Sequence, residues 1–440
     1  MRPNPEAVDT LIHPGWIVPI IPEGDVLTGF SIALKDKKIV AIVPTEETAS
    51  MEAIDVHTLP EHVLMPGLIN CHGHAAMSLL RGYADDHALT PWLEQHIWPA
   101  EAAHVSEDFV RDGATLAMVE MLRSGTTCFS DMYLFPEITA KIASDLGMRC
   151  QIALPVIDAP SVWANSADQY IEKGLAVLDE VKHSDITSVV FGPHAPHTVS
   201  QDSLRKIATL SAELDIGIQI HLHETAAEVL AAVERQGERP LESLNKLGLL
   251  GPKTQCVHMT SLGDQDIALL AATGAHVIHC PASNMKLASG NCPVSKLQRS
   301  GVNVALGTDS AASNNSLNLF NELRMAALLA KINTADATVI PAHRALAMAT
   351  INGAKAMGID HKVGSLEVGK QADIIALDMN TPETLPLYSP ASQLVYACNG
   401  SQLSHSWING KQIVNEGEVT GLDLLALKQS IQKWQHRISG

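Results

Sequence analysis

The pair His72 and His74 is the part of the sequence whose residue types and spacing most directly suggest chemistry. Side chains two residues apart on an extended segment point to the same side, so both imidazoles can reach a single ion. Neutral imidazole nitrogens are ligands that zinc and its neighbours accept. Such a pair arises easily by chance in a chain with 20 histidines, so its meaning depends on where the fold places it.

Two later segments offer further ligands. His221 ends an apolar run and can supply a third nitrogen, and Asp309 ends another run and can supply an oxygen. This set leaves a coordination position open for water, which distinguishes a catalytic metal site from a closed structural one. His223 points to the same side as His221, so either histidine could be the ligand. We favour His221, which lies deeper in the apolar run, and the sequence leaves His223 open between a partner of the ligands and an exposed residue at the rim.

Glu224 follows this segment directly. A carboxylate there can carry a proton between water on a metal and a nitrogen of the substrate. An acid at this place is also typical of the first turn of a helix, and only the nearby histidines favour the catalytic interpretation.

These residues follow predicted strands. Short apolar runs bounded by turn signals predict eight strands, at 64–72, 125–131, 150–155, 188–194, 217–221, 255–258, 276–279 and 302–309. Helical patterns between them include 106–124, 200–214, 226–247 and 263–273. Eight buried strands alternating with helices predict a closed parallel (β/α)8 barrel, whose active site lies at the carboxyl ends of the strands. Seven of the eight runs end in His or Asp, so we expect a metal at this rim.

Both ends of the chain predict a second domain. Strand-like alternation occurs at 9–12, 16–20, 30–34 and 39–43, and again at 372–378 and 406–414, before a final helix at 422–436. We therefore expect an α/β chain with the barrel over 64–368 and one small β-sandwich built from 1–63 and 369–440, the latter part also carrying the final helix.

Composition excludes several classes of protein. The chain has 440 residues, 46% of them hydrophobic, and 30 basic against 48 acidic residues give a net charge of -18. Because a nucleic-acid binder needs a basic face, nucleic acid is an unexpected partner. Neither a signal peptide nor a membrane span is predicted. Seven scattered cysteines without a CxxC pair argue against disulfides and indicate a reducing cytoplasm.

Four segments together resemble the amidohydrolase superfamily, and the resemblance covers nearly the whole chain. They are PGLINCHGH at 66–74, HLHE at 221–224, GTD at 307–309 and GSLEVGKQAD at 364–373. Within that superfamily, AAMSLLRG at 75–82, FGPHAP at 191–196 and PASNMKLASG at 281–290 resemble the 5'-methylthioadenosine/S-adenosylhomocysteine deaminase family.

The resemblance implies one divalent metal ion, and zinc is the expected choice among zinc, iron and manganese, which all accept such ligands. The implied ligands are His72, His74, His221 and Asp309. The implied substrate contacts are His194, Glu224, Asp309 and Glu101, the last with the ribose hydroxyls, while His258 is implied to lie near the metal's water. Trp92, Met132, Tyr133 and Phe135 are candidates for the methylthio pocket, although packing alone also explains them.

The implied activity is hydrolytic deamination of 5'-methylthioadenosine, and of adenosine, to the inosine analogue and ammonia, and the resemblance also suggests a homo-oligomer. Asp309 is expected to accept a proton from the attacking water and Glu224 to donate one to N1 of the adenine ring. No arginine occurs between Arg149 and Arg205, although a guanidinium after the third strand would best bind the carboxylate of S-adenosylhomocysteine. We therefore expect that substrate to be used less well.

Two alternatives remain. A barrel with the same ligands can hydrolyse a triazine or a guanine-like base, and a catalytically silent member can act as a binding protein. The complete ligand set and Glu224 argue against the second alternative, and only substrates can decide the first.

Overall fold

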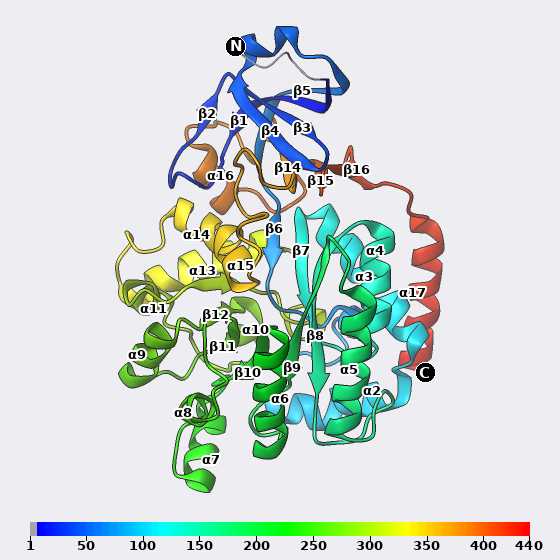
Figure 1. Cartoon of the computed structure of the whole chain (residues 1–440), viewed down its shortest axis with the longest axis vertical. Coiled ribbons are helices and arrows are strands. Elements are labelled where there is room, and N and C mark those ends of the chain that lie inside the picture. The colour runs from blue at the N-terminus through cyan, green and yellow to red at the C-terminus, as the bar shows by residue number, and fades with distance from the viewer. Residues whose placement is uncertain (1–6) are drawn as a thin grey trace.

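The computed structural model describes residues 7–440 and contains an eight-stranded parallel sheet curled into a barrel (Figure 1). Its strands are β6 (Leu68–Asn70), β7 (Thr126–Asp131), β8 (Arg149–Val156), β9 (Thr187–Pro193), β10 (Ile218–Leu222), β11 (Thr254–His258), β12 (His276–His279) and β13 (Val304–Leu306). Each strand lies beside its neighbours in chain order. All eight predicted strands, and the predicted fold class, are confirmed.

The segments that follow the first and last strands join the two ends of this sheet. The backbone N–H of Cys71 donates to the carbonyl of Leu306 at 2.8 Å, and that of Asp309 donates to the carbonyl of His72 at 3.0 Å. The two predicted ligand segments are therefore tied directly to each other by the backbone.

The helices cover the outside of the barrel. Three predicted helices are confirmed: α3 (Glu107–Arg123), α6 (Gln201–Leu214) and α9 (Asp264–Thr273). Further α-helices are α1 (Leu89–Trp92), α2 (Trp98–His104), α4 (Pro136–Leu146), α5 (Ala167–Val181), α10 (Pro281–Lys286), α11 (Val294–Arg299), α12 (Ala311–Asn314), α13 (Leu319–Thr334), α14 (Ala342–Met348), α15 (Ile351–Ala356) and α16 (Pro390–Tyr396).

The prediction of one helix over 226–247 is wrong. The chain forms α7 (Ala226–Gln236) and α8 (Pro240–Lys246) instead. Gly237 ends α7 with a left-handed φ of 78°. Pro240 is the first residue of α8, where a backbone N–H would have no partner within the helix, so its absence breaks no hydrogen bond.

A second, nine-stranded mixed sheet contains strands from both ends of the chain. Its members are β1 (Val8–Ile17), β2 (Leu27–Thr28), β3 (Phe30–Lys35), β4 (Lys38–Pro44), β5 (Ala53–Pro66), β14 (Ile374–Asp378), β15 (Leu403–Ile408), β16 (Lys411–Asn415) and β17 (Glu418–Val419). Strand β5 pairs with β1 on one side and with β14 on the other, so both chain ends build one β domain as predicted, with its strands joined in a single mixed sheet. The boundaries at 63/64 and 368/369 stay predictions.

Several details of this sheet differ from the expectation. The predicted strands at 9–12 and 16–20 are one strand, β1, and the long strand β5 was not predicted. The segment 406–414 falls in a hairpin of β15 and β16, because Asn409 and Gly410 adopt left-handed φ values of 52° and 77° that turn the chain.

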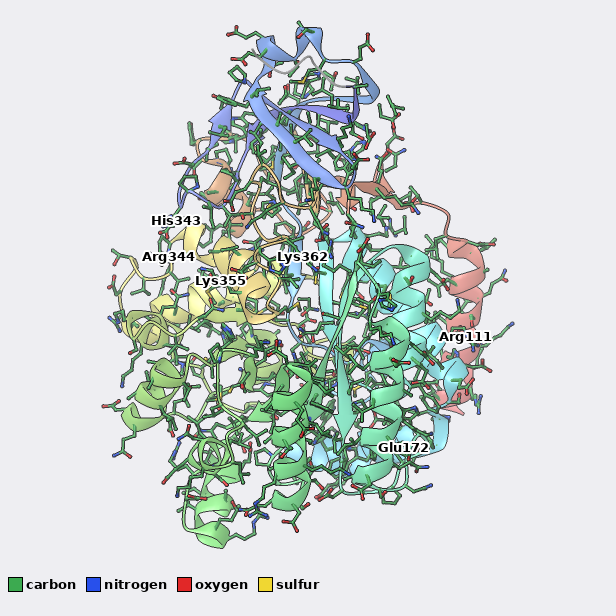
Figure 2. The ribbon with its side chains drawn as sticks, viewed as in Figure 1. Arg111, Glu172, His343, Arg344, Lys355 and Lys362 are labelled. Atoms are coloured by element: carbon green, nitrogen blue, oxygen red, sulfur yellow. The ribbon has the colours of Figure 1, made fainter. Side chains whose placement is uncertain are left out.

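Side chains also link the helices around the barrel to the loop between β1 and β2 and to the final helix. His343 and Arg344 of α14 (Figure 2) both contact Oε1 of Glu23, at 2.9 and 2.8 Å. The final helix α17 (Leu424–Ser439) lies against α3, where Trp434 donates to Asp112 at 2.7 Å (Figure 1). Within residues 7–440, no helix has the length and hydropathy that crossing a membrane requires.

Candidate metal centre

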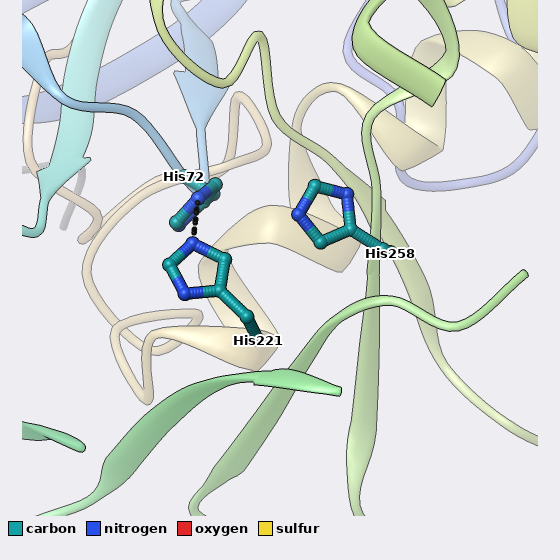
Figure 3. Close-up of side chains that lie close together, drawn as sticks. All are labelled: His72, His221 and His258. Carbon is teal, nitrogen blue, oxygen red and sulfur yellow. Dashed lines mark hydrogen bonds between the residues drawn. The ribbon is translucent and has the colours of Figure 1, made fainter. Parts of the chain in front are cut away.

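Five side chains from four barrel segments converge at the carboxyl ends of the strands: His72, His74, His221, His258 and Asp309. Nε2 of His72 lies 3.1 Å from Nε2 of His221 (Figure 3). Oδ1 of Asp309 lies 3.3 Å from Nε2 of His74 and 3.6 Å from Nε2 of His72. The predicted gathering of strand-end residues is present in the structure.

These separations fit a tetrahedral ion. Two ligand atoms that each lie about 2.0–2.1 Å from a tetrahedral zinc ion are about 3.3 Å apart. The ligand atoms of His72, His74 and Asp309 all lie within 4.8 Å of one another, as do those of His72, His221 and His258. The donor set of imidazoles with one carboxylate is one that zinc prefers.

Hydrogen bonds at Nδ1 orient the imidazoles. Nδ1 of His74 donates to the carbonyl of Met132 at 2.6 Å, and Nδ1 of His221 donates to the carbonyl of His194 at 2.7 Å. Because a carbonyl can only accept, the proton of each neutral ring sits on Nδ1 and leaves the lone pair of Nε2 for an ion. His258 is held in the same way, through Nδ1 and the Asn284 side chain at 2.9 Å.

Burial favours the neutral imidazoles that a metal needs. It lowers the pKa of His72 and holds the pKa of His221 well below its usual range. For His74, burial also acts to lower the pKa, but the nearby Asp309 carboxylate outweighs it and raises the pKa to about 9. A cation that enters the cluster therefore displaces one proton from this pair.

Asp309 is held in one orientation by three donors. Its Oδ2 accepts from the hydroxyls of Ser283 at 2.6 Å and Ser313 at 3.1 Å, and its Oδ1 accepts from the N–H of Ser310 at 2.8 Å. Burial alone would raise the pKa of Asp309, but the bonds with the two neighbouring histidines keep it well below its usual range. The carboxylate thus stays charged in a buried place.

Glu224 lies next to this cluster. Its Oε2 is 3.6 Å from Nε2 of His258, its Oε1 is 3.5 Å from the hydroxyl of Ser289, and its N–H donates to Glu228 at 3.0 Å. Burial, reinforced by the charge of Asp309, raises the pKa of Glu224 to about 8. A carboxyl group that holds its proton at neutral pH can act as a general acid.

The other predicted substrate contacts border the same place. Glu101 on α2 accepts a hydrogen bond of 2.6 Å from the Tyr133 hydroxyl. Burial raises the pKa of Glu101 against the effects of Tyr133 and of the His74 charge. The ring of His194 lies 5.0 Å from that of His221, and its Nδ1 is 2.9 Å from the Thr198 hydroxyl.

Of the pocket candidates, Trp92 and Tyr133 are buried in one apolar cluster, together with Leu287. Phe135 packs against the edge of this cluster, but Met132 belongs to a different cluster formed by Met132, Ala153 and Val190. The structure therefore brings three of the four candidates together.

His223 is buried and does not lie at an exposed rim. Its Nδ1 donates to the carbonyl of Ser261 at 3.0 Å, and its Nε2 accepts from the N–H of Leu241 at 3.1 Å. Both ring nitrogens are used by the backbone, so His223 fixes the loop after β10 and cannot ligate a metal in this arrangement.

Two other strand-end residues do not join the ligands. Asp131 accepts from the N–H of Ala75 at 2.6 Å and so holds the loop that carries the first two histidines. His279 is buried, but neither group of possible ligands within residues 7–440 includes it. Asn284 and Gln219, which hold His258 and His72, were not predicted, because a buried amide has no recognisable sequence pattern.

The Amidohydrolase family model matches residues 63–413 of this chain. A 5-methylthioadenosine/S-adenosylhomocysteine deaminase of Teredinibacter turnerae is 49% identical over 436 residues, which cover 99% of both chains. A 5'-deoxyadenosine deaminase of Methanosarcina barkeri is 41% identical over 97% of both chains.

Among solved structures, an adenosine deaminase from Xanthomonas campestris with bound zinc superimposes with a TM-score of 0.98, at 43% identity and 99% coverage of both chains. An atrazine chlorohydrolase from Arthrobacter aurescens has a TM-score of 0.89 at 22% identity, covering 97% of this chain and 100% of its own, and therefore shares the fold alone.

Proposed function

This chain belongs to the amidohydrolase family, and from that premise we propose that it hydrolytically deaminates 5'-methylthioadenosine to the inosine analogue and ammonia. The observation that carries this proposal is the position of Glu224, 3.6 Å from His258, beside a buried cluster of imidazoles and the Asp309 carboxylate. The names of the relatives at 41–49% identity, deaminases of methylthioadenosine, S-adenosylhomocysteine or 5'-deoxyadenosine, support a 5'-modified adenosine as the substrate class.

We assign His72, His74, His221 and Asp309 as the residues that hold one divalent metal ion. The distances among their ligand atoms and the proton positions on their rings support this assignment. The zinc in the related adenosine deaminase supports zinc as the ion. When bound, the ion activates a water molecule for attack on C6 of the adenine ring.

The protein's own groups then move the protons. Asp309, fixed by its serine donors, accepts a proton from the attacking water, and Glu224 donates its proton to N1 of the ring. His258 lies between the ligands and Glu224, at 3.6 Å from the latter, where it can hold the water in line. Asp309 then gives the proton that it took to the departing amino group, and the remaining hydroxyl proton passes to Glu224. Ammonia leaves as the ring carbonyl forms, and both carboxyl groups return to their starting protonation states.

The sugar and its 5' substituent are expected to meet the remaining candidates. Glu101 keeps one carboxylate oxygen for the ribose hydroxyls, since the other accepts from Tyr133. His194 borders the ligand His221, and Trp92 supplies an apolar wall for the thioether.

We also propose that the apolar thioether is preferred over S-adenosylhomocysteine. Arg149 cannot serve its carboxylate, because it is buried at the start of β8 in an ion pair with Asp373 at 2.8 Å. After β8, Asp158 is bound to the N–H of Ser200 and adds a negative charge instead. Arg235 on α7 is exposed, and its charge lowers the pKa of His197, which follows β9. If S-adenosylhomocysteine is used well, Arg235 is the residue to replace in order to find the group that binds its carboxylate.

The test is the ultraviolet change when the zinc-loaded protein meets 5'-methylthioadenosine, adenosine, S-adenosylhomocysteine, guanine and a triazine. We expect the highest kcat/KM with methylthioadenosine, and a loss of about 100-fold or more in kcat for Glu224→Gln with unchanged zinc content. Turnover of guanine or the triazine alone would replace the proposed substrate. Failure to hold zinc or to turn over any of the five would favour the binding-protein alternative.

Two further expectations concern the setting of the enzyme. All seven cysteines are buried and unpaired, which supports a reducing compartment such as the cytoplasm. The second expectation is a homo-oligomer, which light scattering can measure.

A further inference from the structure

Three glutamines lie inside the barrel, where branched apolar side chains usually fill the space. Gln219 on β10, Gln255 on β11 and Gln151 on β8 are 0%, 1% and 2% exposed. A buried amide lowers stability unless its donors and acceptors are satisfied. These three side chains therefore need an explanation beyond filling the core.

The three amides form one directed chain of hydrogen bonds that begins at His72. Nδ1 of His72 donates to Oε1 of Gln219 at 2.8 Å, and Nε2 of Gln219 donates to Oε1 of Gln255 at 2.6 Å. Nε2 of Gln255 donates to Oε1 of Gln151 at 2.8 Å, and Nε2 of Gln151 reaches the carbonyl of Met357 at 3.5 Å. Every bond runs in the same direction.

The strand register builds this chain. Gln219 and Gln255 are direct partners in the parallel pair of β10 and β11, so their side chains emerge side by side into the barrel. Gln219 is also anchored locally, because its Nε2 lies 2.9 Å from the carbonyl of Cys71 and 3.1 Å from the hydroxyl of Ser130. The amide next to His72 thus has one possible orientation, with its oxygen toward the ring.

We propose that Gln219, Gln255 and Gln151 are positioning residues for the metal, acting through His72. By accepting a hydrogen bond from the Nδ1–H of His72, Gln219 fixes the tautomer in which Nε2 is free for the ion. Hydrogen bonds in one direction polarise each other, so the more distant amides strengthen the oxygen that faces His72 and make its Nε2 a better ligand. The inference rests on the metal site of the proposed function and not on its substrate.

The effect is expected to fall with distance from His72. Gln219→Met removes the acceptor itself. Substitution of a residue that holds a ligating histidine typically lowers metal affinity about 10–100-fold. Gln255→Met removes only the second link, while Gln219 keeps its contacts with Cys71 and Ser130. We therefore expect a smaller loss of zinc affinity for this variant, below about tenfold.

The experiment measures transfer of zinc from the holoenzyme to a competing chelator, and the visible spectrum of the cobalt-substituted protein. The matched control is Gln402→Met, because Gln402 is 4% exposed and accepts from the N–H of Asn399 in the turn before β15, outside the barrel. The expected order of zinc affinity is wild type and Gln402→Met first, Gln255→Met next and Gln219→Met last, with the cobalt bands shifted only in the last two. Gln219→Glu restores an acceptor and is expected to bind zinc more tightly than Gln219→Met.

Wild-type zinc affinity in both Gln219→Met and Gln255→Met would overturn the proposal, as would an equal loss in Gln402→Met. If Gln219→Met does not fold, Gln255→Met alone decides, because it leaves the group that contacts His72 in place. No substrate is used, so a protein that binds zinc as expected but deaminates nothing would refute the proposed function and leave this inference standing.

Discussion

Replacing Asp373 with Asn is expected to destabilise the protein strongly without changing its catalysis. Asp373 and Arg149 form a buried ion pair, with side chains 3% and 4% exposed and with N–O distances of 2.8 and 3.0 Å. The variant keeps an acceptor for the N–H of Asn409, which bonds to Asp373 at 2.8 Å, but leaves the guanidinium buried without a counter-charge. Breaking one partner of such a pair costs about 3–5 kcal/mol in unfolding free energy.

A double-mutant cycle gives the magnitude its sharpest test. Arg149→Met alone leaves the Asp373 carboxylate buried without a counter-charge, and it is expected to lower the unfolding free energy by about the same amount. If the two effects were independent, they would sum to about 6–10 kcal/mol. The double variant removes both charges, and we expect it to lose about 3 kcal/mol or less. Urea unfolding of the zinc-loaded protein, followed by tryptophan fluorescence, measures all four free energies.

The matched control is Asp185→Asn, which breaks the exposed ion pair of Lys37 and Asp185 at 2.6 Å and is expected to leave the midpoint unchanged. Because Arg149 starts β8, at the barrel end opposite the metal centre, KM should stay at the wild-type value in every folded variant. An additive cycle, or a fall in stability of Asp373→Asn no larger than in the control, would refute the reasoning.

Three further outcomes follow from the geometry. Burial and two neighbouring histidines lower the pKa of His405 to about 4, so its neutral ring contributes fully to the unfolding free energy above about pH 6.5, and this contribution is lost as the pH falls toward 4. His405→Phe should remove about 1 kcal/mol of that decline, after allowance for solvent screening of this half-exposed ring. An unchanged dependence of the urea midpoint on pH would contradict this expectation. Gly307→Ala places a methyl group 2.9 Å from Cβ of His72 and should weaken zinc binding at least about tenfold in chelator competition, so retained affinity would argue against the assigned ligand. Ser283→Ala removes the 2.6 Å donor to Asp309 and should weaken zinc binding about tenfold with little change in thermal stability; a large loss of stability with normal zinc affinity would show that this serine serves the fold instead.

The barrel and the gathering of its strand-end side chains were predictable because both depend on rules that act locally. Each buried strand is a short apolar run between turns, and parallel strands place whatever follows them at one rim. His72, His221 and Asp309 could therefore be grouped although they are far apart in the sequence. The long strand β5 escaped prediction because many of its residues before Val63 are exposed and give no apolar run.

The rest of the site depends on contacts that no local rule encodes. His223 resembles a ligand in its spacing, but a left-handed φ of 51° and the N–H of Leu241, on the separate helix α8, give it a structural role. The break between α7 and α8 that brings Leu241 there rests on Gly237 and Pro240 within a pattern that is otherwise helical. The same break explains why the sequence left the role of His223 open.

The bonds that close the barrel also assemble the metal centre. Asp309 donates its N–H to the carbonyl of His72, so the segments that carry the first and last of the proposed ligands are held together by the backbone itself. The hydroxyl of Ser283, which follows β12, then turns the Asp309 carboxylate toward the histidines. Because most of this arrangement comes from backbone and neutral donors, the entering ion displaces the proton that the Asp309 carboxylate favours on His74. Preorganisation of this site requires several polar groups to be buried, and the hydrogen bonds that satisfy those groups also hold the proposed ligands in place.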